Sequence, residues 1–228
     1  MYERILFPTD GSEGAKVAFD HVLDIAAEHD AAVHILNVAD TTQESVFLLQ
    51  RDVSDALEEE GERIVGDAAE RAHQRGVATV TDVVRGDPYS SIVDYAGSRG
   101  IDLVAMPTHG RRGLERLLLG STTERVVRRA DVPVLTIRPD ESTATYPYRD
   151  VLVPTDGSDC ATEALSIGIE IAIGAEAALH LLSVIDTASL GVGVRTDVPM
   201  TSLAEYAHEI RENASDDAED AGVESVSQ

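Results

Sequence analysis

Residues 3–40 read ERILFPTDGSEGAKVAFDHVLDIAAEHDAAVHILNVAD. The apolar run at residues 5–8 predicts a buried strand, and Ser12 is placed to cap a helix that continues to about Glu28. The apolar residues 32–38 predict a second strand. Because a strand, a helix and a strand follow in this order, we expect a right-handed crossover between parallel neighbours.

The alternation of strands and helices continues to residue 139. Helical spacing at residues 44–75 ends at Gly76, which favours a left-handed cap, and Asp87 and Pro88 are typical of a helix start. Further elements are expected as strands at 77–84, 101–106 and 132–137 and as a helix at 121–129. The sequence therefore predicts an α/β domain with a five-stranded parallel sheet and helices on both faces.

The first stretch recurs as RDVLVPTDGSDCATEALSIGIEIAIGAEAALHLLSVID at residues 149–186. The two copies keep one offset of 146 residues, the separation of Pro8 and Pro154, so the fold is duplicated. We expect a complete domain at 1–139, a linker at 140–148 and a partial second domain at 149–228, which lacks the counterpart of 83–139. A truncated sequence and a natural half-domain both fit; unburied apolar surface and open sheet edges favour truncation.

The charge balance limits the partners. The chain has 42 acidic and 18 basic residues, a net charge of −24, and Lys16 is its only lysine. Such a surface repels nucleic-acid phosphates and anionic lipid, so we expect neither as a partner. Molar salt would screen the self-repulsion, which suggests a halophilic host as a hypothesis. The N-terminus lacks a signal-peptide pattern, so a cytoplasmic protein is expected, and Cys160 is interpreted as a small apolar filler.

Polar groups gather where the predicted strands end. Asp10 follows the first strand, where a carboxylate could accept hydrogen bonds from an amine or a ribose hydroxyl; capping the next helix is an equal alternative. Gly110 and the segment Gly120-Ser121-Thr122 suit a phosphate at a helix N-terminus, although helix caps would also explain both glycines. His109 has no recognisable acid or nucleophile partner and is expected to position the loop. His34 and His180 lie mid-strand at matching places in the two copies and are expected to be core residues bonded to their neighbours.

Four segments together resemble the universal stress protein family: ILFPTDGS, ILNVAD, DLVAMPTHGRRGLERLLLGSTTERVV and VPVLTIRP. The resemblance implies the strand order 3-2-1-4-5 and dimerisation through residues 132–137, or pairing of the two copies within one chain. The ATP-binding branch of the family carries G-x2-G-x9-G-[ST]. Gly110, Gly120 and Ser121 match this pattern, whereas Pro107 replaces its first glycine.

The resemblance also implies the residues of a nucleotide site. Asp10 and Val38 would flank adenine and ribose, Met106 would line the base pocket, and the glycine segment would hold phosphates. The full set of implied nucleotide-binding residues is Pro8, Thr9, Asp10, Val38, Met106, Pro107, His109, Gly110, Gly120, Ser121 and Thr122. ATP with magnesium is the one cofactor implied, and no catalytic or metal-binding protein residue is expected.

Three functions remain open at this point. The first is a stress-response protein that binds an adenine nucleotide, is non-catalytic or weakly hydrolytic, and acts through assembly or partners. The second keeps the fold as an interaction module without nucleotide, and Pro107 favours it because proline has no N–H to offer a ligand. The third is an ATP-hydrolysing enzyme of a related fold, against which stand the missing paired carboxylates and activated nucleophile.

Overall fold

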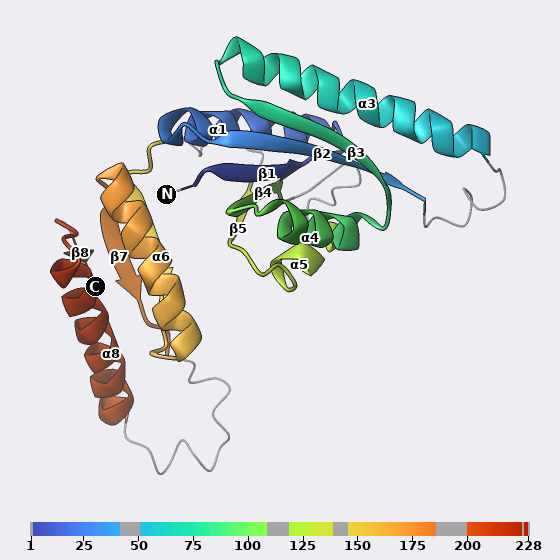
Figure 1. Ribbon diagram of the computed structural model, residues 1–228. Helices are drawn as coiled ribbons and strands as arrows, with labels where there is room; N and C mark the ends of the chain where they lie inside the picture. The colour runs from blue at the N-terminus through green and yellow to red at the C-terminus, as the bar shows by residue number, and fades with distance from the viewer. Residues whose placement is uncertain are drawn as a thin grey trace, which may run out of the picture. The chain divides into compact units, whose positions relative to one another are not determined.

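The computed structural model describes residues 2–41, 51–108, 119–138, 146–185, 200–224 and 226–227. The chain divides into two compact units, Met1–Tyr146 and Pro147–Gln228 (Figure 1). Most of the expected linker, residues 140–145, lies outside the described residues, so its bounds stay a prediction. No helix in the described parts of the chain is long and apolar enough to cross a bilayer.

The first unit contains a five-stranded parallel sheet in the order β3-β2-β1-β4-β5. This confirms the predicted fold class and strand order. The strands are β1 (Arg4–Pro8), β2 (Ala32–Asp40), β3 (Thr79–Gly86), β4 (Leu103–Pro107) and β5 (Val134–Ile137). They begin and end within two residues of the expected positions, as expected for element boundaries.

Helices cover both faces of this sheet (Figure 1). They are α1 (Glu13–His29) and α3 (Arg51–Gln74) on one face, and α4 (Pro88–Arg99) and α5 (Ser121–Val127) on the other. Alternate side chains of β1 enter the two layers: Ile5 and Phe7 join the core with α1, and Leu6 joins the core with α4 and α5. Residues 44–50, where the second helix was expected to begin, lie outside the described residues.

The turn between β1 and α1 is fixed by local chemistry and by α3. Ser12 caps α1 by accepting the Ala15 N–H at 3.2 Å, as its position predicts. Gly11 has a φ of 73°, and a Cβ added there would lie 2.9 Å from Cγ1 of Ile64 on α3. Glycine is therefore needed for both the backbone conformation and the close approach of α3.

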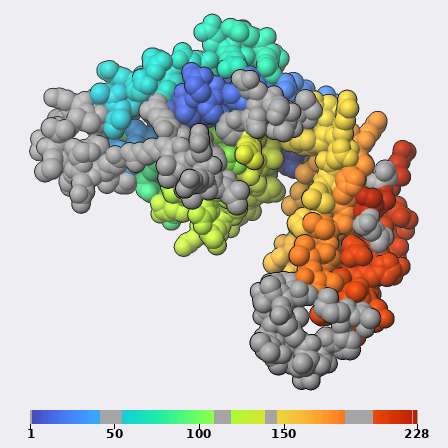
Figure 2. All heavy atoms as spheres, turned by 180° about the vertical axis from the view of Figure 1, so that it is seen from behind, coloured from blue at the N-terminus to red at the C-terminus, as the bar shows by residue number. Residues whose placement is uncertain are grey.

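The second unit repeats the first part of this design. It contains the parallel strands β6 (Asp150–Pro154), β7 (Ala178–Leu182) and β8 (Val226–Ser227) in that order. Helices α6 (Asp159–Ala175) and α8 (Met200–Asp220) lie side by side in Figures 1 and 2. They cover the face of the sheet that Val153, Leu179 and Leu181 present.

The other face of the second sheet is exposed in the described structure. Leu6 and Leu36 of the first unit are 0% and 1% exposed beneath α4 and α5, whereas their counterparts Leu152 and Leu182 are 61% and 43% exposed. Val184 adds a third exposed side chain. We call Leu152, Leu182 and Val184 the bare face, since none of the described elements of the second unit packs on it.

Burial corrects two expectations for the second unit. Cys160 is exposed near the start of α6, so its interpretation as an apolar filler is wrong. His180 was expected in the core, as was His34, but the side chain of His180 is 41% exposed, and its Nε2 lies 2.9 Å from Asp150. His34 is 8% exposed and is buried as predicted. His180 thus repeats the strand position of His34, but among the described residues of the second unit no helix packs on this face of the sheet.

A partly buried chain of hydrogen bonds connects β2, α4 and β3 of the first unit. Tyr95 donates to Asp82 at 2.6 Å, and the Tyr95 hydroxyl lies 3.1 Å from Nδ1 of His34. Burial lowers the pKa of His34 from its ordinary value of 6.5, and the nearby Arg99 lowers it further, although Asp82 acts in the opposite direction. The first unit therefore binds its His34 proton at a lower pH than the unfolded chain does.

We expect His34 to make unfolding depend on pH. As pH falls through about 6.5, the unfolded chain takes up this proton first, so the free energy of unfolding should fall as the pH drops below about 7. His34→Gln keeps a hydrogen-bonding side chain without a titrating group, so its pH slope should be shallower. Urea unfolding at several pH values would measure both slopes, and equal slopes would contradict the prediction.

Candidate functional site

The site candidate lies where the strand order of the first unit reverses. From β1 the sheet extends through β2 to β3 on one side and through β4 to β5 on the other. In open parallel sheets, ligands bind at the carboxyl ends of the strands at such a reversal. Pro8 ends β1, Met106 and Pro107 end β4, and Val38 lies in β2 two residues beyond the partner of Pro8.

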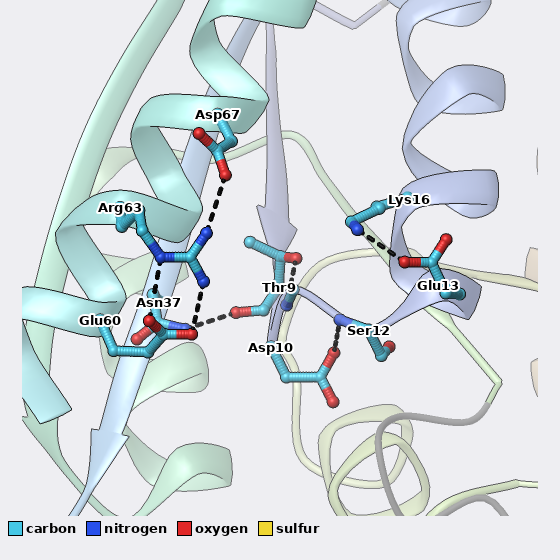
Figure 3. Close-up of polar contacts among 10 residues, drawn as sticks. Thr9, Asp10, Ser12, Glu13, Lys16, Asn37, Glu60, Arg63 and Asp67 are labelled. Atoms are coloured by element: carbon cyan, nitrogen blue, oxygen red, sulfur yellow. Dashed lines mark hydrogen bonds and ion pairs between the residues drawn. The ribbon is translucent and has the colours of Figure 1, made fainter.

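Asp10 helps to build the turn after β1 (Figure 3). Its Oδ1 accepts the Ser12 N–H at 3.0 Å, and the Thr9 N–H donates to the Leu36 carbonyl at 2.8 Å. Ser12, not Asp10, is the N-cap of α1. The carboxylate therefore has a structural role in the turn as well as its position at the edge of the sheet.

Asn37 is a residue of this edge that sequence reasoning missed. It is 7% exposed, and its Nδ2 donates to the Thr9 carbonyl at 2.8 Å, which joins β2 to the β1 turn (Figure 3). It also contacts α3, because a Cβ on Gly61 would lie 2.6 Å from Asn37 Oδ1. A polar residue inside the apolar run AVHILNVAD was the available signal.

Hydrogen bonds hold the start of α5 against the end of β4. The Gly120 N–H donates to the Thr108 carbonyl at 2.7 Å, and the Thr108 N–H donates to the Ile137 carbonyl at 2.8 Å. The buried hydroxyl of Thr123 donates to the Pro107 carbonyl at 3.1 Å. The first turn of α5 is therefore fixed beside the last residue of β4.

Gly120 is the N-cap of α5 and has extended backbone angles, φ −68° and ψ 153°. No side chain caps the helix, because glycine has none to offer. Ser121 and Thr122 occupy the first two helical positions, where N–H groups point away from the helix and the helix dipole favours negative charge. The helix-cap alternative for Gly120 is thus observed, and it is compatible with an anion at the same place.

Nine of the eleven residues implied from sequence lie in the described structure at or beside this edge. They are Pro8, Thr9, Asp10, Val38, Met106, Pro107, Gly120, Ser121 and Thr122. His109 and Gly110 lie outside the described residues. Val38 and Met106 belong to the same apolar cluster, on the α4 and α5 face of the sheet. Within the described ranges, no three His, Cys, Asp or Glu side chains are placed to hold a metal ion.

Comparisons with known proteins agree with this architecture. The model of the universal stress protein family matches residues 1–138 and 147–228. Universal stress protein MJ0531 of Methanocaldococcus jannaschii is 37% identical over 144 residues, which cover 60% of this chain and 83% of that protein. The solved structure of MJ0577, from the same organism, has 32% identity and a TM-score of 0.58, over 62% of this chain and 99% of its own.

A solved structure of a universal stress protein from Archaeoglobus fulgidus matches more of the chain. It covers 85% of this chain and 70% of its own length, with a TM-score of 0.68 and 22% identity, and so shows the fold. The family model spans both units, and the five-stranded sheet has the matching strand order. The chain therefore belongs to the universal stress protein family.

Proposed function

We propose that the first unit binds an adenine nucleotide, ATP with magnesium, and that the protein is a non-catalytic or weakly hydrolytic stress-response protein acting through assembly or partners. One observation carries the proposal: the turn after β1, the end of β4 and the uncapped first turn of α5 meet at the reversal of the strand order. An apolar wall, a carboxylate and helix N–H groups that no side chain among the described residues caps lie at one edge, and they match the three parts of a nucleotide.

Each part of this edge has a proposed contact. Asp10 would accept hydrogen bonds from ribose or the adenine amine, and Val38 and Met106 would contact the base. Gly120, Ser121 and Thr122 would hold phosphates, with Gly110 and His109 in the segment before them. Assembly would use β5, either between two chains or between the two copies within one chain.

The second candidate is an interaction module of this family without nucleotide, and Pro107 favours it. Proline has no N–H, and Pro107 stands where the ATP-binding pattern has a glycine. It is also buried, and its carbonyl accepts a hydrogen bond from Thr123. Pro107 therefore offers a phosphate neither an N–H nor the space beside a glycine.

Titration of Mg-ATP into the full chain in molar KCl tests the first candidate, and Asp10→Ala should weaken binding by about tenfold, the effect of one lost hydrogen bond to a charged group. Asp156→Ala is the matched control. Asp156 accepts the Ser158 N–H at 3.0 Å in the same turn of the second unit, yet the α5 segment is not repeated there.

The outcomes separate the two candidates. Saturable binding that only Asp10→Ala weakens supports the nucleotide site. Equal loss in both variants would instead indicate a general effect of the turn on folding. No heat from a folded wild-type chain would leave the interaction module as the function.

A further inference from the structure

A cavity of about 130 Å³ lies between α1 and α3, above the end of β1. Phe7, Phe19 and Ile64 form its apolar part, and its charged lining consists of three cations, Lys16, Arg63 and Arg71, and one carboxylate, Asp67. Phe7 and Phe19 belong to the core on the α1 and α3 face of the sheet, whereas Met106 and Val38 lie in the cluster on the opposite face. The cavity therefore lies on the opposite face of the sheet from Met106 and Val38, although Thr9, one of the implied nucleotide-binding residues, also lines it.

Two of these cations, Lys16 and Arg63, form ion pairs that are exposed to solvent. Lys16 pairs with Glu13 at 2.6 Å, and Arg63 binds Glu60 through two hydrogen bonds of 2.7 and 3.0 Å and Asp67 at 3.2 Å, so within the described residues these partners are on the cation's own helix (Figure 3). Exposed pairs at this spacing contribute about 0.3–0.5 kcal/mol. An anion in the cavity can therefore replace a carboxylate at little cost. Lys16 is also the only lysine of a chain with net charge −24.

The two cations do not join the helices. That role belongs to Arg71, which pairs with Asp20 across α1 and α3, and to Arg75, which pairs with Asp24 outside the cavity. Figure 3 shows Lys16 on α1 and Arg63 on α3, on two sides of the turn after β1. Packing of α1 against α3 therefore does not explain them.

The second unit is an internal reference for this cavity. We call the uncharged residues that line the cavity its frame. The second unit has uncharged residues at the matching positions: Thr155, Gly157, Ala161, Leu165 and Ile210. A Cβ on Gly157 would lie 3.1 Å from Ile210, which repeats the contact of Gly11 with Ile64. The three cations are nevertheless replaced by Thr162, Glu209 and Asp217. The uncharged residues pack in the same way without them. Arg71 is explained by its ion pair with Asp20, but Lys16 and Arg63 require another reason.

We propose that the cavity of the first unit binds a small organic anion with an apolar body. The anionic head, a carboxylate or a phosphate, lies between Lys16 and Arg63, and the body packs on Phe19 and Ile64. Neutral residues of the frame and weakly held cations together fit this class, because charge fixes the head and burial of the body supplies the remaining affinity. This function is additional to nucleotide binding.

Titration of hexanoate into the full chain, in molar KCl with saturating Mg-ATP, tests the proposal. Inorganic phosphate and hexylammonium are the matched probes, the first without an apolar body and the second with the opposite charge. The double variant Lys16→Thr/Arg63→Glu introduces the residues of the second unit and should weaken the binding of hexanoate at least tenfold. Arg75→Ala, which also introduces the residue of the second unit but lies outside the cavity, should bind as the wild type does.

We expect saturable hexanoate binding that exceeds binding of both matched probes. Titration of hexyl phosphate then identifies the preferred head group. If hexyl phosphate binds more tightly than hexanoate, the head group is a phosphate, and if it binds more weakly, the head group is a carboxylate. The absence of saturable hexanoate binding would overturn the proposal, as would equal affinity in the double variant. If the double variant fails to fold, Arg63→Gln keeps the test open, because it removes one charge and should still weaken hexanoate several-fold.

Discussion

Leu6→Ala is expected to lower the free energy of unfolding of the first unit by about 3–5 kcal/mol, which is the usual cost of emptying a leucine site in a packed core. Leu6 is 0% exposed, lies in β1 between β2 and β4, and packs in the cluster beneath α4 and α5. Neighbours fixed on every side cannot collapse into the cavity. Urea unfolding in molar KCl, followed by circular dichroism, would measure the loss.

Leu152→Ala is the matched control, because Leu152 occupies the same position in the second copy. It is 61% exposed on the bare face, so its truncation removes little buried area and should cost less than about 1 kcal/mol. The contrast between the two leucines tests the description of the bare face directly. Equal losses would mean that Leu152 is covered in solution, contrary to its exposure in the structure.

Gly120→Asp should raise the dissociation constant of Mg-ATP at least about a hundredfold, roughly 2.7 kcal/mol. The new carboxylate would occupy the N-cap of α5 and compete with the phosphates for the N–H groups of Ser121 and Thr122. Aspartate is a favourable N-cap, and the φ of −68° suits any residue. The variant should therefore remain folded while binding is lost.

Gly120→Ser is the control for charge at this position. Serine also caps a helix but carries no charge. Gly120→Ser should therefore raise the dissociation constant of Mg-ATP several times less than Gly120→Asp does. Calorimetric titration gives both constants, and the melting temperatures show that the helix is intact. If the serine variant binds Mg-ATP as weakly as the aspartate variant does, the loss of affinity is due to the size of the new side chain and not to its charge.

Local chemistry was the most predictable part of the fold. Ser12 and the pair Asp87 and Pro88 cap helices as expected, because a cap depends on the few residues that follow it. The fixed offset of the repeat likewise predicted the second unit. The burial expected for His180 was wrong because burial depends on which elements pack over a residue, and the second unit offers fewer of them among its described residues. The expectation for Cys160 was wrong because this residue lies at the exposed start of α6, and its counterpart Gly14 is not buried in the first unit either.

The candidate site was predictable to a smaller extent. Gly120 was identified as a helix start, but the bond from Thr123 to the Pro107 carbonyl joins groups 16 residues apart in the chain. Asn37 was missed for a similar reason, since its partner Thr9 is 28 residues away, on the neighbouring strand. Spacing along the chain carries no information on such contacts, which arise only when the sheet and its helices have assembled.

The strand β1 and its repeat β6 occupy matching positions in the two copies but have different lateral partners. β1 is hydrogen-bonded to β2 and β4, whereas β6, among the described strands, is bonded only to β7. About half of the amides of any strand point to each side, so roughly half of those in β6 face water. Their protons can be replaced by deuterium while the second unit stays folded, but those of β1 must wait for the sheet to open. The backbone amides of this repeated strand should therefore exchange with deuterium at two different rates within one molecule.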